Sequence, residues 1–100
     1  MAQRTPFEQR MFDAVANLCQ GEVVSFGDVA GKAGRPGASR AAGRMLSKIR
    51  DTDLPWWRIV YSNGKLPACN PTLQTQRLEA EGVTVEKNRV TLAPRGRFEK

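Results

Sequence analysis

A break in the helical pattern of the first half of the chain constrains the fold more than any other feature. Gly34 ends one short helical segment, and the turn 35–37 contains a proline that cannot continue it. The earlier segment begins at Ser25, a predicted N-cap, with Asp28 at the third helical position. The later segment, 38–50, carries apolar residues at helical spacing: Ala42, Met45, Leu46 and Ile49. The pattern predicts a helix-turn-helix, although many other helical pairs share it.

Arg40 stands among small side chains on the outer face of the second helix. Its neighbours there, Ser39 and Gly43, have almost no side chain. A helix that reads the major groove usually carries Arg, Asn or Gln to reach base edges. Small residues instead let a helix backbone approach the narrow minor groove, with an arginine inserted as a probe. Longer helix-forming residues would serve a purely solvent-exposed face better than glycine, so the pattern favours minor-groove binding.

The charge balance indicates an anionic partner. The chain has 16 Lys and Arg against 10 Asp and Glu, which gives a formal net charge of +6. A small domain this basic has the electrostatic footprint of a nucleic-acid binder, with a solvated basic surface as the alternative.

The chain has 100 residues, of which 40% are hydrophobic, so we expect a single domain over 1–100 with one core. The basic tail 94–100 is expected to be mobile. No apolar run approaches the ~20 residues that span a bilayer, and residues 1–4 lead into a polar segment rather than a signal-peptide core. We therefore expect a cytoplasmic monomer without a membrane partner, associated with the nucleoid when it binds DNA.

The chain contains no histidine. This removes the usual general base, the Cys/His nucleophile pair and most zinc sites. Cys19 and Cys69 do not have the CxxC spacing of a redox or metal pair, and nothing near Cys19 in sequence supplies a base to activate it. We therefore expect no catalytic residue, no metal and no cofactor.

Short elements are predicted on both sides of the helix-turn-helix. A capping box at Thr5–Glu8 starts a helix that runs to residue 17 or 18, with an apolar stripe on the core. Residues 58–66 have the pattern of a β-hairpin around the turn Asn63–Gly64. A hairpin after a helix-turn-helix is a wing, so a winged helix-turn-helix is expected.

The last third of the chain predicts one helix and one hairpin. Thr72 is the expected N-cap of a helix that ends at Gly82. Residues 83–92 have the pattern of a second hairpin. The expected fold class is therefore mostly α with small β-hairpins.

The two tryptophans of the chain, Trp56 and Trp57, are adjacent and stand between Pro55 and Arg58. If this stretch leads into a strand, neighbouring side chains point to opposite faces. One indole would then anchor in the core while the other faces a cleft. Two ordinary core aromatics are the alternative, because tryptophan is highly buried on average.

Four segments together resemble the C-terminal DNA-binding domain of O6-alkylguanine-DNA alkyltransferases, in the family's order and near its spacing. They are Gly21–Phe26, Ala38–Gly43, Pro55–Arg58 and Leu78–Gly82, and the resemblance covers about residues 5–92. Those enzymes carry a Pro-Cys-His-Arg motif, in which the cysteine takes the alkyl group and the histidine activates it. Here tryptophans stand at both positions. The chain thus resembles the alkyltransferase-like proteins, which bind alkylated guanine flipped from the duplex and mark it for nucleotide excision repair without repairing it themselves.

The resemblance implies roles for individual residues. Arg40 corresponds to the arginine finger that fills the space of the extruded base, and its stacked guanidinium partly offsets the cost of flipping. Trp56 would line the alkyl pocket, together with Pro55 and Arg58. Arg58 would support the pocket by binding backbone or phosphate. Trp57 would anchor the stretch in the core. The residues expected to contact DNA are Ser25, Phe26, Ala38, Ser39, Ala41, Gly43 and Arg44.

Two positions depart from the family pattern. Phe26 stands where the family usually has a tyrosine whose hydroxyl contacts the phosphate next to the flipped nucleotide. Phe26 cannot make that hydrogen bond, so we expect Ser25 or a backbone N–H to replace it. The loop 65–71 is short and has no arginine, which leaves the range of accepted alkyl groups open.

Three functions follow as hypotheses. The leading one is a non-enzymatic sensor of O6-alkylguanine in double-stranded DNA, with nucleotide excision repair proteins as further partners. A winged-helix regulator without lesion specificity fits the same fold pattern. The third is an alkyltransferase that uses Cys69 or Cys19, which the lack of an activating histidine disfavours.

Overall fold

The chain divides into two units, and the boundary crosses the bond between Trp56 and Trp57. The computed structural model describes residues 5–46, 54–68 and 70–99. The first unit comprises residues 1–17 and 26–56, and the second comprises 18–25 and 57–100. The expected core residue Ile49 and the alternative nucleophile Cys69 lie outside the described residues.

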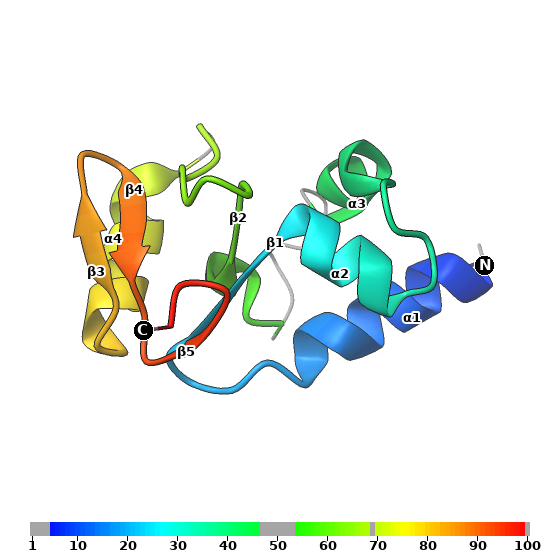
Figure 1. Cartoon of the computed structure of the whole chain (residues 1–100), viewed down its shortest axis with the longest axis horizontal. Helices are drawn as coiled ribbons and strands as arrows, with labels where there is room; N and C mark the ends of the chain where they lie inside the picture. Colours follow the sequence, from blue (N-terminus) through cyan, green and yellow to red (C-terminus); the bar gives the residue numbers. More distant parts are fainter. Residues whose placement is uncertain (1–4, 47–53, 69, 100) are drawn as a thin grey trace. The chain divides into compact units, whose positions relative to one another are not determined.

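The described residues of the first unit form three helices, α1 (Pro6–Ala16), α2 (Phe26–Lys32) and α3 (Ser39–Leu46) (Figure 1). The predicted capping box starts α1. The Thr5 hydroxyl accepts from the Glu8 N–H at 3.1 Å, and the Glu8 carboxylate accepts from the Thr5 N–H at 2.7 Å. The core of this unit consists of small and medium apolar residues: Phe7, Met11, Val15, Val29, Ala30, Ala33, Ala42 and Leu46.

The turn between α2 and α3 confirms the predicted helix-turn-helix. Gly34 and Gly37 adopt φ of +93° and +91°, the left-handed region that favours glycine. The helix 38–50 is described only as far as Leu46, and Met45 is half-buried rather than part of the buried core. None of the helices in the described part of the chain is long and apolar enough to cross a membrane.

A small parallel sheet organises the second unit. The central strand β1 (Glu22–Ser25) pairs with β2 (Ile59–Val60) on one side and β5 (Arg95–Gly96) on the other. The helix α4 (Pro71–Ala80) and the hairpin β3 (Thr84–Glu86) and β4 (Arg89–Leu92) complete the unit. Its core is formed by Val23, Val60, Leu66, Leu78, Val83, Val90 and Ala93.

The first predicted hairpin is wrong, whereas the second is confirmed. The 61–65 turn forms, but β2 pairs with β1 and Lys65 bridges to Arg89 instead. Both residues of β2 are buried, a pattern typical of a covered parallel strand rather than a half-exposed hairpin. In the second hairpin, Lys87 and Asn88 have positive φ, as the tightest two-residue turns require.

Two further expectations need correction. The helix α4 is capped by Asn70, whose side chain accepts from the Leu73 N–H, and not by Thr72. The reason is Pro71, which is favoured at the first position of a helix and so places the cap just before it. The expected mobile tail contains β5, which is held because the Arg97 N–H donates to Val23 O at 2.9 Å.

Candidate functional site

The Trp-Trp-Arg stretch is a turn of 3₁₀-helix, η1 (Trp56–Arg58), and not the extended segment that the sequence predicts. The Trp56 N–H donates to Leu54 O at 2.8 Å, which closes a tight turn around Pro55. The fixed φ of proline favours such a turn. Successive side chains of a 3₁₀-helix are about 120° apart around the helix axis, not the 180° of a strand, so the two indoles need not point to opposite faces.

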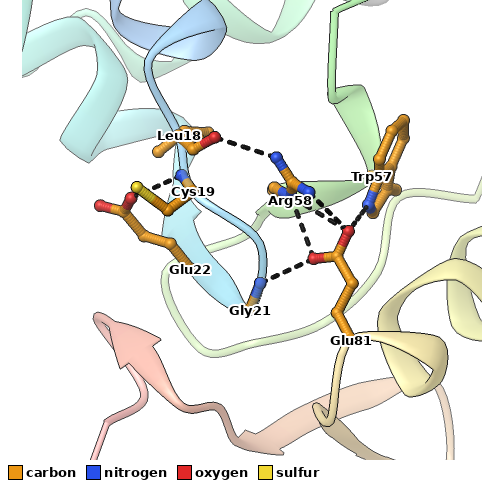
Figure 2. A network of polar contacts seen from close by, with 7 residues as sticks. All are labelled: Leu18, Cys19, Gly21, Glu22, Trp57, Arg58 and Glu81. Atoms are coloured by element: carbon orange, nitrogen blue, oxygen red, sulfur yellow. Dashed lines mark hydrogen bonds and ion pairs between the residues drawn. The ribbon is translucent and has the colours of Figure 1, made fainter.

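One carboxylate, that of Glu81 at the end of α4, gathers the hydrogen bonds of this turn (Figure 2). It accepts from Trp57 Nε1 at 2.9 Å and from the Gly21 backbone N–H at 2.8 Å. Arg58 donates to it through Nη2 at 2.6 Å and Nε at 3.0 Å. Burial opposes ionisation, but the hydrogen bonds from Arg58, Gly21 and Trp57 and the charge of Arg58 outweigh it and lower the pKa of Glu81.

Arg58 directs all three nitrogens of its guanidinium to partners within the second unit. Besides the two contacts with Glu81, Nη1 donates to Leu18 O at 2.9 Å (Figure 2). The side chain is only 13% exposed. Arg58 thus binds backbone at Leu18, while its role in the lesion pocket stays a prediction.

Trp57 packs against the apolar core of the second unit, which agrees with its expected role as the anchor. Its ring also contacts two cations: the guanidinium carbons of Arg58 and Arg77 lie 5.2 and 4.8 Å from a ring centroid. Both distances are within the range of cation–π attraction. The indole of Trp57 is therefore fixed by its polar edge as well as by its faces.

Gln74 is a site residue that the sequence reading does not find. It is 2% exposed, and its Nε2 donates to Trp57 O and to Ile59 O, each at 3.0 Å. Its spacing is the feature of the sequence that could have indicated it. Residue 74 lies four residues before Leu78 and seven before Glu81, which is the spacing of side chains on one face of a helix.

The predicted DNA-binding residues on α3 lie on its outer side or are half-buried. Ser39, Arg40 and Arg44 are exposed, whereas Ala41 and Gly43, and Ala38 just before the helix, are half-buried. A Cβ added to Gly43 would lie 3.9 Å from Phe26 Cδ1, so the half-buried Phe26 ring adjoins this helix. The structure thus brings Phe26 and Gly43 together.

Ser25 is a correction to the predicted DNA contacts. Its side chain is 2% exposed because Val23 and Ser25 are the inward-pointing residues of β1. A buried hydroxyl does not offer a phosphate contact at the surface. Of the two expected replacements for the missing tyrosine hydroxyl, the backbone N–H stays a prediction.

Of the two cysteines in the alternative of an enzyme, only Cys19 lies within the described residues. Cys19 is a free, exposed thiol whose backbone N–H donates to the Glu22 carboxylate at 2.9 Å. Within 5–46, 54–68 and 70–99, no three His, Cys, Asp or Glu side chains are grouped so that they could hold a metal ion.

Comparison with known proteins identifies the family. Residues 6–83 match the family model described as the DNA-binding domain of 6-O-methylguanine DNA methyltransferase. The chain belongs to this family. Within it, the chain is similar to the alkyltransferase-like branch, as its sequence predicts, and the mostly helical fold with small sheets is confirmed.

Two relatives and one solved structure illustrate the similarity. The chain is 41% identical to the DNA base-flipping protein of Escherichia coli (strain K12) over 88 residues, which cover 85% of this chain and 68% of that protein. It is 30% identical to alkyltransferase-like protein 1 of Schizosaccharomyces pombe, covering 79% of this chain and 78% of that one. The crystal structure of S. pombe Atl1 with damaged DNA containing O6-carboxymethylguanine superposes with a TM-score of 0.74 at 28% identity, covering 85% and 83% of the two chains.

Proposed function

We propose that this protein is a non-enzymatic sensor of O6-alkylguanine in double-stranded DNA. The observation that carries the proposal is the pair of tryptophans at positions 56 and 57 in a chain without any histidine. The resemblance matches these two positions to the cysteine and histidine of the enzymes. The relatives named for base flipping, and the similar structure bound to damaged DNA, support it.

In this proposal, α3 enters the minor groove and Arg40 takes the space of the extruded base. Flipping a nucleotide costs a few kcal/mol, least for a damaged base. Stacking of a base on an aromatic ring is worth ~1–3 kcal/mol. With Trp56 as the pocket wall, stacking and the guanidinium together offset the flipping cost preferentially at the lesion.

The sensor leaves the alkyl group in place, so other proteins complete the repair. Nucleotide excision repair removes a damaged segment without reversing the damage, which suits a protein that only marks the site. The protein acts in the cytoplasm on chromosomal DNA.

The first test compares duplexes with and without one O6-methylguanine at moderate salt. We expect clearly tighter binding to the lesion, and affinity for both duplexes that falls steeply with salt because phosphate contacts release counterions. Arg40→Ala should remove the lesion preference. Lys32→Ala, which removes an exposed cation from α2, is the matched control and should retain it. Equal binding of the two duplexes by the unaltered protein would refute damage recognition and favour a regulator without lesion specificity.

The second test addresses the enzyme alternative. After incubation with alkylated duplex, the intact mass of the protein should be unchanged. A stable alkyl adduct on Cys19 or Cys69 would overturn the non-enzymatic assignment.

A further inference from the structure

The helix α4 reaches the Trp-Trp-Arg turn through side chains on one of its faces. Glu81 binds the side chains of Trp57 and Arg58, as described above. Gln74, two turns earlier on the helix, binds the main chain instead. Its amide nitrogen donates to Trp57 O and to Ile59 O, each at 3.0 Å, and so joins the middle of η1 to the start of β2.

The chemistry of this contact is specific for a carboxamide. Both partners are carbonyl oxygens, which only accept, so the group between them must donate two hydrogens from one atom. A neutral amide nitrogen does so without burying a charge, whereas a carboxylate would repel both oxygens. Because Gln74 is 2% exposed, water does not compete readily for either bond.

We propose that Gln74 is a positioning residue for the lesion pocket, an inference that rests on the proposed sensor function. Its two bonds flank Arg58 in the chain and fix the backbone on both sides of it. Arg58, one of the residues assigned to the lesion pocket, lies between the two bonded carbonyls, so the placement of this backbone segment sets where its side chain begins. Gln74 thereby acts on lesion recognition without touching the lesion.

The test compares Gln74→Met with Gln76→Met. Both substitutions replace a glutamine of α4 with an apolar side chain of similar length, but Gln76 is exposed. The readout is the ratio of affinities for lesion-containing and undamaged duplex. A purely structural role lowers the folded fraction, which scales both affinities by the same factor and leaves their ratio unchanged.

We expect Gln74→Met to reduce the lesion preference by about tenfold, as the loss of well-aligned buried hydrogen bonds allows. Gln76→Met should leave the ratio within about twofold of the unaltered protein. Near-UV circular dichroism of the tryptophans should change in the first variant only. A lesion preference that survives intact in folded Gln74→Met would overturn the inference.

A second variant covers the case in which Gln74→Met does not fold. Gln74→Asn keeps the amide but is one methylene shorter, so it reaches one carbonyl at most, and we expect an intermediate loss of about threefold. An unchanged ratio in this variant would also overturn the inference. If the unaltered protein shows no lesion preference, the proposed function itself fails, an outcome distinct from a preference that does not depend on Gln74.

Discussion

Gly43 tests whether α3 approaches DNA as closely as its small side chains imply. Among the described residues nothing requires glycine here. Its φ lies outside the left-handed region, and the one atom of those residues near an added Cβ is Phe26 Cδ1, at an ordinary 3.9 Å. Glycine inside a helix is about 0.5–1 kcal/mol less favourable than alanine. Gly43→Ala should therefore stabilise the protein by about that amount, which corresponds to a rise in Tm of roughly 2–8 °C for a domain of this size.

The effect on DNA binding should have the opposite sign. If the α3 backbone rests against the walls of the minor groove, the new methyl group occupies contact space. Overpacking of a close contact costs typically ~1–3 kcal/mol, which corresponds to a loss of about 5- to 150-fold in affinity. Gly31→Ala is the matched control, because Gly31 is an exposed glycine within α2 and its added Cβ meets nothing within 4 Å. It should stabilise the fold equally and leave affinity unchanged.

Thermal unfolding followed by circular dichroism and fluorescence anisotropy with labelled duplexes would measure both effects. A Gly43→Ala variant that is stabilised and still binds DNA as tightly as the unaltered protein would refute close approach of α3. A variant that is destabilised would instead show that Gly43 has a structural constraint within the protein.

Three further predictions concern the second unit. Glu81→Gln removes the ion pair with Arg58 and leaves a nearly buried cation, so it should lower the free energy of unfolding by about 3 kcal/mol in urea titrations. The control is Glu79→Gln, which changes an exposed carboxylate of the same helix and should alter this free energy little. The folded pKa of Glu81 is lowered from 4.5, so its stabilisation is fully present above that pH and is lost as the pH falls through the lowered value. Acid titrations should therefore show a steeper loss of stability for the unaltered protein than for Glu81→Gln. Gly96→Ala would place a Cβ 2.4 Å from Val23 O at a φ of +88°. We expect it to lower the free energy of unfolding by about 2–3 kcal/mol or more in urea titrations. A free energy of unfolding within about 0.5 kcal/mol of the unaltered protein would contradict the pairing of β5.

The features that the sequence predicts correctly are those decided by neighbours in the chain. The capping box at Thr5, the glycine turn before α3 and the Lys87–Asn88 hairpin all depend on residues within a few positions of one another. The parallel pairing of β1 with β2 and β5 depends on segments that are tens of residues apart. Strands of two residues, such as β2 and β5, are too short to show a periodic hydrophobic pattern that would predict the pairing. A strong Asn-Gly turn signal at 63–64 therefore predicts the turn but not the partner of the strand before it.

The same distinction holds for the site. The Trp-Trp-Arg stretch is visible in the sequence because both tryptophans are there, and the resemblance assigns Arg40 its role. Gln74 and Glu81 act through contacts 15 to 60 residues away in the chain, which no local pattern encodes. The resemblance places Ser25 among the DNA contacts, but no local pattern shows that its side of β1 is covered.

The Arg58–Glu81 pair needs an explanation other than stability. The two side chains are 13% and 9% exposed, so both charges are largely desolvated, and apolar residues of similar volume would often stabilise a fold at least as well. The proposed sensor transfers no alkyl group, so in that role the network has no reaction to serve. What the network does provide is direction, because the guanidinium fork, the indole N–H and the carboxylate each fix one orientation of their partner. A turn held in one orientation before DNA arrives has less conformational freedom to lose on binding, which suits the proposed role in lesion recognition.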